Sequence, residues 1–220
     1  MSALDQIIRE TPALWRGRGG QPERPGANAV DTGFTDLNTL LPTGGWPLRA
    51  LIELNVATWG SGELQLLLPL MARLTQEQIR VAMVAPPYQP YAPALVQAGI
   101  ALSYLVVVDV EEKSNRDIWW SAEKLLRHPD CGLVLLWPSI PHPAQIRRLQ
   151  LAADAANNIG VVLRCGRSAD APVALRLKVS RCAGGIQAEL IKSRFGWRQH
   201  GAVVLTVPES YSSSGQAAYP

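Results

Sequence analysis

Residues 50–74 read as a strand, a glycine-containing loop and a helix, an arrangement that can bind phosphate. The expected strand, Ala50–Val56, runs into the loop Ala57-Thr58-Trp59-Gly60-Ser61-Gly62, and the expected helix is Glu63–Leu74. Such a turn brings backbone N–H groups and a helix N-terminus to one point, where an anion binds. A working phosphate-binding loop ends in Gly-Lys-Ser/Thr, whereas this one ends in Gly62-Glu63-Leu64.

Glu63 and Leu64 remove the chemistry that a nucleotide site needs. The usual lysine neutralises the β- and γ-phosphates, and the usual hydroxyl holds Mg²⁺. A carboxylate at position 63 instead repels the phosphates, on the order of several kcal/mol in a partly desolvated site. We therefore predict no ATPase activity and no cofactor, with Gly60, Gly62, Glu63 and Leu64 as the remnant of a phosphate loop. The alternative is an ordinary helix start, where the helix dipole favours an acidic residue.

Two further strand ends lack the carboxylates of an ATPase. The expected strand Gly132–Trp137 runs into Pro138-Ser139, where a metal-binding Asp would stand. The expected strand Ile79–Ala85 runs into Pro86-Pro87, where a RecA-type ATPase would place its catalytic Glu. We predict no catalytic residue at either end.

Metal binding is not expected either. Cys131, Cys165 and Cys182 are odd in number and show no paired CxxC spacing, so reduced structural thiols are the better interpretation. The three histidines are scattered along the chain, and none has a second ligand at helical spacing.

Basic charge is concentrated toward the C-terminus. Residues 140–200 hold 10 of the 21 Lys and Arg but only 3 of the 18 Asp and Glu. These cations can meet DNA phosphates or an acidic protein surface, or they form an ordinary solvated face. The candidate contacts are Arg176, Lys178, Arg181, Lys192, Arg194 and Arg198.

The chain divides into three parts. Residues 1–30 read as a short helix followed by a Gly/Pro/Arg-rich linker. That helix either packs on its own core or docks on a partner through Leu4, Ile7, Ile8, Leu14 and Trp15. Residues 31–207 form the expected core domain, and the Ser/Gly/Ala-rich tail, residues 208–220, is expected to be disordered.

The core alternates apolar β-type runs with helical patterns, which is typical of a mostly parallel α/β sheet covered by helices on both faces. Three shorter strands at the end, with Gly184-Gly185 as a hairpin turn, predict an antiparallel edge. No apolar run approaches the roughly 20 residues of a membrane span. With 47% hydrophobic residues, the chain is expected to be a soluble cytoplasmic protein.

The expected elements carry two unusual features. The helix Glu63–Leu74 is apolar around nearly its whole circumference, so it is buried on both sides or faces a partner, and Pro69 should kink it. Trp119 and Trp120, on the expected helix Asp117–Arg127, cannot both enter one core, because neighbouring helical residues point about 100° apart.

The opening segment of the core resembles that of RecA-type proteins. The pattern runs through Asp31-Thr32-Gly33-Phe34, Leu40-Leu41-Pro42, Gly44-Gly45-Trp46-Pro47 and Ile52-Glu53-Leu54. Downstream, the residues from Ile186 to Gly196 are similar to the RecA-like strand that ends in a Lys-Asn/Ser-Arg pattern. The resemblance covers about residues 30–207 and implies a RecA-like three-layer fold.

Within that superfamily the chain resembles the ImuA family of bacterial translesion-synthesis accessory proteins. The resemblance lies in Trp46-Pro47, Gly60–Leu64, Leu66–Leu70 and Leu14-Trp15-Arg16-Gly17. It implies a non-catalytic, SOS-induced adaptor in DNA repair that acts with RecA and the polymerase-like protein ImuB. Contact with DNA would be direct or through these partners.

A second resemblance is to SulA, the SOS-induced division inhibitor that binds FtsZ. It lies in the stretches Leu66–Leu74 and Leu95–Ile100. SulA proteins are shorter and lack the RecA-like opening and the C-terminal strands. Inhibition of division is therefore the alternative function.

Overall fold

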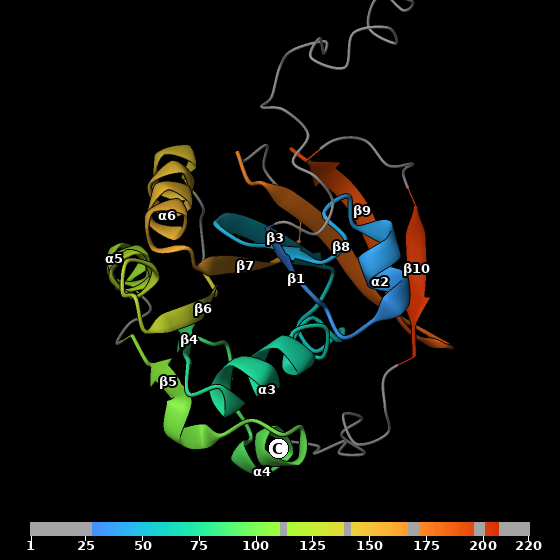
Figure 1. The fold of residues 1–220 in the computed structure, drawn as a ribbon, viewed down its shortest axis with the longest axis horizontal. Coiled ribbons are helices and arrows are strands. Elements are labelled where there is room, and N and C mark those ends of the chain that lie inside the picture. Colours follow the sequence, from blue (N-terminus) through green and yellow to red (C-terminus); the bar gives the residue numbers. More distant parts are fainter. Residues whose placement is uncertain (1–27, 111–113, 139–141, 167–171, 196–200, 207–220) are drawn as a thin grey trace, which may run out of the picture.

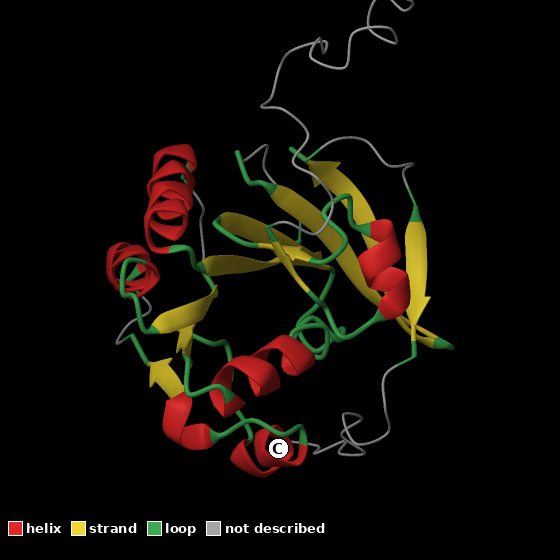
Figure 2. Cartoon of the chain, in the orientation of Figure 1, coloured by secondary structure: helices red, strands yellow, loops and turns green. Residues whose placement is uncertain are grey.

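The computed structural model describes residues 28–110, 114–138, 142–166, 172–195 and 201–206. They form an α/β fold around one eight-stranded sheet, with helices on both sides of it (Figures 1 and 2). Leu4, Ile7, Ile8, Leu14, Trp15 and Arg198 lie outside the described residues, as does the tail from 208. No helix among the described residues is long and apolar enough to cross a bilayer.

The sheet has six parallel strands and an antiparallel edge, as the sequence predicts. In spatial order its strands are β10 (Ala202–Leu205), β9 (Gly185–Ser193), β8 (Leu175–Cys182), β3 (Ala50–Val56), β7 (Ile159–Cys165), β6 (Cys131–Leu136), β4 (Arg80–Val84) and β5 (Leu105–Val108). The strands from β8 to β5 run parallel, whereas β9 pairs antiparallel with both β8 and β10. The β8–β9 hairpin turns at Ala183-Gly184, close to the expected position.

Two apolar cores lie on opposite faces of the sheet, because strand residues alternate between the faces. Helices α2 (Thr35–Leu40), α3 (Leu68–Gln76) and α4 (Ala92–Gln97) pack with one face. Helices α5 (Asn115–Leu126) and α6 (Pro143–Ala156) pack against the other, over β3, β4, β6 and β7 (Figure 1). A 3₁₀ turn, η1 (Leu102–Tyr104), precedes β5.

The Asp31-Thr32-Gly33 segment at the start of the core forms a compact hydrogen-bonded turn beside α3. In sequence it lies between the two strands of a small ribbon, in which β1 (Ala29–Val30) pairs antiparallel with β2 (Trp46–Pro47). Asp31 Oδ1 accepts hydrogen bonds from Gly33 N–H and from the Asn38 side chain. Gly33 has a φ of +84° and lies so close to Pro69 that a Cβ there would collide with its ring. The motif therefore fixes the start of α2 against the start of α3.

These contacts make the turn sensitive to acid. The hydrogen bond from Asn38, that from Gly33 and the charge of Arg73 lower the pKa of Asp31 below its ordinary value of 3.8. A lowered folded-state pKa stabilises the fold above the unfolded-state pKa, and this contribution is lost as the pH falls through the folded-state value. We expect Asp31→Ala to lower the free energy of unfolding at pH 7 by less than about 1 kcal/mol, because the carboxylate is exposed. Urea unfolding between pH 2.5 and 7 should show this loss shrinking in acid, and a loss independent of pH would contradict the prediction.

Candidate functional site

The glycine-containing loop follows the carboxyl end of β3, which is an interior strand of the sheet. From β3 the chain crosses to β4 on one side, whereas from β7 it crosses to β8 on the other. Ligands of open α/β sheets bind at the carboxyl ends of the strands where such connections diverge. The start of the loop is tied to β7, since Gly166 N–H donates to Val56 O at 2.9 Å and Cys165 Sγ to Ala57 O at 3.0 Å.

Glu63 closes this loop from within. Its side chain folds back so that Oε1 accepts a hydrogen bond from Gly60 N–H at 2.9 Å. The residue is only 7% exposed, and Oε2 is buried without a hydrogen-bond partner among the described residues. The carboxylate thus occupies a backbone N–H group of the kind that binds phosphate in a functional loop.

The glycines of the loop are required by its geometry. Gly60 and Gly62 have φ values of +82° and +99°, in the region that only glycine adopts freely. A Cβ on Gly62 would lie 2.5 Å from Ile186 Cδ1, and Ile186 is itself buried. The loop also holds itself together through Ser61 Oγ, which donates to Thr58 O at 2.6 Å.

The prediction that a helix begins at Glu63 is wrong. Residues 63–67 form turns, and α3 begins at Leu68 with Pro69 in its first turn. A proline is tolerated there because the first N–H groups of a helix have no intrahelical acceptor. Pro69 therefore opens the helix instead of kinking it, and Glu63 is not a first-turn acid of α3. Leu66, Leu67 and Met71 are fully buried, so the apolar run forms core.

The two other strand ends carry apolar residues and proline. After β6, Trp137 packs against the core, and its backbone N–H donates to Val84 O at 3.2 Å. After β4, Ala85 has a φ of +52° and leads into Pro86-Pro87. Neither segment offers a carboxylate to a metal or a water.

A buried ion cluster lies on the α5/α6 face near the middle of the sheet. Glu53 of β3 is fully buried and forms ion pairs with Arg176 of β8 at 3.1 Å and with Arg164 of β7 at 3.7 Å. Both arginines are largely buried as well. The prediction that Arg176 is a contact for DNA or a partner is therefore wrong, because its guanidinium is occupied by Glu53 and only 7% of the residue is exposed.

The other described residues of the predicted basic set differ in exposure. Lys178 is exposed on β8, opposite Glu189 of β9. Lys192 is partly buried opposite Arg176, and Arg181 is exposed next to the hairpin. Arg194 is exposed, with its guanidinium 4.9 Å from the centre of the Phe195 ring. Among the members of the predicted set that the structure describes, Lys178, Arg181 and Arg194 are exposed.

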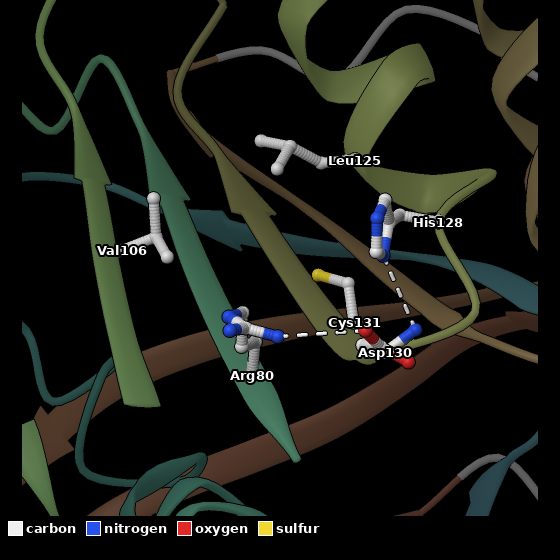
Figure 3. A pocket seen from close by; sticks show the side chains of 6 residues that line it. All are labelled: Arg80, Val106, Leu125, His128, Asp130 and Cys131. Carbon is white, nitrogen blue, oxygen red and sulfur yellow. Dashed lines mark hydrogen bonds and ion pairs between the residues drawn. The ribbon is translucent and has the colours of Figure 1, made fainter. Parts of the chain in front are cut away.

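A pocket of about 340 Å³ opens near the amino ends of β4 and β6 (Figure 3). Arg80 and Asp130 form an ion pair of 3.6 Å at it, and Asp130 N–H donates to His128 Nδ1. Burial raises the pKa of the Cys131 thiol to about 11, so the thiol is protonated at neutral pH. A protonated thiol is a poor nucleophile. Within the described ranges, no three His, Cys, Asp or Glu side chains are grouped to hold a metal ion.

The thiols should therefore differ in reactivity. Cys165 is exposed whereas Cys131 is buried. We expect iodoacetamide at pH 7.5 to modify Cys165 at least about tenfold faster than Cys131, since accessible thiolate determines the rate. Mass spectrometry of peptides over time measures both rates, and comparable labelling of Cys131 in the folded protein would contradict the prediction.

The buried ion cluster could have been noticed in the sequence. Glu53 and Arg164 each lie in a mostly apolar strand, and a charge inside a buried strand requires a partner. Arg176 is harder to single out, because its strand also contains Lys178 and Arg181. Which charge meets which depends on the order of the strands, and the sequence pattern does not contain that order.

Comparison of the chain with known protein families finds none that matches, and comparison with curated proteins finds no similar one. The functional assignment therefore depends on the residues and geometry of the chain itself.

Proposed function

We propose that this chain is a RecA-like, non-catalytic accessory protein of the ImuA type. It acts in the bacterial cytoplasm, at the nucleoid, in SOS-induced translesion DNA synthesis. Its partners are ImuB and RecA, and it works by binding them without turning over nucleotide.

The observation that carries the proposal is the loop closed by Glu63. The loop follows an interior strand at the carboxyl edge of a parallel sheet, which is where a nucleotide-binding loop belongs. Its Gly60 N–H is occupied by the Glu63 carboxylate, and Leu64 offers no metal ligand. A domain that keeps this architecture without its chemistry is suited to binding other proteins.

The C-terminal strands favour the ImuA-type assignment over SulA. Strands β8, β9 and β10 are integral to the sheet, and Ile186 and Leu205 contribute to its core. The Asp31-Thr32-Gly33 turn of the RecA-like opening packs against Pro69 at the start of α3. Both features are ones that the shorter SulA proteins lack.

Nucleotide binding provides the first test. We expect millimolar ATP with Mg²⁺ to leave the thermal unfolding midpoint unchanged. A ligand at 100 times its Kd would add about 2.7 kcal/mol to the free energy of unfolding, which a thermal shift detects easily. Stabilisation by ATP would overturn the non-catalytic proposal.

Partner binding provides the second test. The purified full chain should bind ImuB and RecA directly, measured by surface plasmon resonance. Removal of residues 1–16, which contain Leu4, Ile7, Ile8, Leu14 and Trp15, should weaken this binding. Unchanged binding by the truncated chain would show that the partner surface lies elsewhere, and binding to FtsZ alone would favour the SulA-like function.

A further inference from the structure

Two neighbouring tryptophans on α5 have opposite environments, as the sequence predicts. Trp119 is 4% exposed and donates its Nε1–H to Asn115 Oδ1 at 3.2 Å. Trp120 is 60% exposed, although the Lys124 ammonium lies 5.9 Å from its ring centre. Exposed tryptophans are enriched among the residues that dominate protein interfaces.

A hollow of about 290 Å³ lies beside Trp120, between α5 and α6. From α5 it is lined by Arg116, Trp119, Trp120 and Glu123, and from α6 by Gln145 and Arg148 among others. Leu151 of α6 is also exposed, one helical turn beyond Arg148. An apolar ring, an aliphatic side chain and charged groups thus occupy the same helix pair.

Gln145 leaves an unmet hydrogen bond at this hollow. Its Oε1 is buried and accepts no hydrogen bond from the described residues. A buried acceptor without a donor is unfavourable until a donor reaches it. A ligand that supplies an N–H or O–H group at this point would satisfy it.

The charges around the hollow leave a positive excess. Glu123 forms ion pairs with both Arg127 and Arg148, so one carboxylate serves two guanidiniums. Arg116 is exposed and forms no ion pair with the described residues. A partner that brings a carboxylate to Arg116 would neutralise this excess positive charge.

We propose that the α5/α6 hollow binds an acidic, apolar peptide segment of a partner protein. A carboxylate of that segment pairs with Arg116, an apolar side chain covers Trp120, and a backbone N–H donates to Gln145 Oε1. This inference rests on the proposed function, because it takes from it the premise that the chain acts by binding proteins. It adds a surface on the α5/α6 face of the sheet, made of residues other than 1–16.

A peptide fits this surface better than a nucleic acid does. The outward-facing phosphate groups of a nucleic acid offer only acceptors, so its donors for Gln145 Oε1 would have to come from an unstacked base or a 2′-hydroxyl. A nucleic acid carries a negative charge at every phosphate, so some of these charges would meet Glu123 in the wall, whereas a peptide can place one carboxylate at Arg116 and neutral groups elsewhere. An acidic peptide carries donors on its backbone and acidic and apolar groups on its side chains.

Selection of peptides on the full chain tests the proposal. A phage-displayed random library is panned against the immobilised protein, and the selected peptides are synthesised and titrated by fluorescence anisotropy. We expect Asp or Glu within a few residues of a large apolar residue in these peptides. Arg116→Glu and Trp120→Ala should each weaken their binding at least about tenfold, the loss expected of interface hot spots.

Two matched variants serve as controls. Arg147→Glu makes the same change of charge at an exposed position of α6 that does not line the hollow. Tyr91→Ala removes an aromatic side chain that is exposed at a distant site. Both should bind the peptides as the parent does, and circular dichroism checks that all four variants are folded.

Three outcomes would overturn the proposal. They are a library that yields no binder, peptides without acidic residues, and peptides that bind Arg116→Glu as tightly as the parent. Binding of a single-stranded oligonucleotide that Arg116→Glu abolishes would assign the hollow to nucleic acid instead. Each of these results would leave the test with ImuB and RecA unaffected, so failure of this surface and failure of the proposed function are distinguishable.

Discussion

Replacing Glu53 with alanine is expected to lower the free energy of unfolding by about 3–5 kcal/mol, the loss typical of breaking a buried ion pair. Glu53 is fully buried, and its carboxylate pairs with both Arg176 and Arg164. Without it, two largely buried guanidiniums lose the negative charge that they share. Urea unfolding at pH 7 measures the effect, and Glu53→Gln, which keeps an oxygen acceptor for Arg176, should lose less.

Glu123 offers a matched control for this experiment. It also holds two arginines, Arg127 and Arg148, but both of these side chains are at least half exposed. Although the Glu123 side chain is only 16% exposed, its two guanidinium partners stay hydrated, so Glu123→Ala should cost about 1 kcal/mol, less than Glu53→Ala. If Glu53→Ala and Glu123→Ala lost similar stability, burial would not be what makes the Glu53 cluster important.

Replacing Glu63 with alanine is expected to destabilise the loop at the end of β3. The variant loses the hydrogen bond from Gly60 N–H, and a bond to a charged group contributes about 1.5–3 kcal/mol. Removing the unpartnered Oε2 offsets part of this loss. Glu63→Gln keeps an oxygen that can accept from Gly60, so it should lose about 1 kcal/mol or less.

Hydrogen exchange gives a local measurement of the same effect. The Gly60 amide proton should exchange faster in Glu63→Ala, about tenfold for each 1.4 kcal/mol of lost stability. Amide protons of β6, far from the loop in sequence, should be affected less. An unchanged rate at Gly60 would mean that Glu63 does not hold the loop closed.

Much of the fold could be predicted because its signals are local. The strand Ala50–Val56 has the predicted ends. The helical pattern of the sequence predicts a helix over Pro143–Asn157, and α6 ends one residue earlier, at Ala156. Alternation of short apolar runs with helical patterns is a property of neighbouring residues, as is the difference between Trp119 and Trp120. The sequence does not predict the ribbon of Ala29–Val30 with Trp46–Pro47, because a strand of two residues is too short to show the alternation of apolar and polar residues.

The site was predicted less completely because it depends on contacts between distant residues. Glu63 was expected at a helix start, but Pro69 places that start at Leu68 and leaves Glu63 free to fold back on Gly60. Arg176 looked like a surface cation, and only the pairing of β3 with β8 brings it to Glu53. The α5/α6 hollow likewise requires two helices whose packing no local pattern specifies.

The closure by Glu63 has a consequence for timing. In many nucleotide-dependent switch proteins, hydrolysis sets how long a complex lasts. The γ-phosphate orders segments of the protein, and hydrolysis releases them. A loop whose N–H group is occupied by its own carboxylate would not alternate between a phosphate-bound state and a released state. If the chain works as proposed, its complexes would form and dissolve according to how much of each partner the cell makes and degrades. Control would then rest with synthesis and proteolysis, outside the molecule.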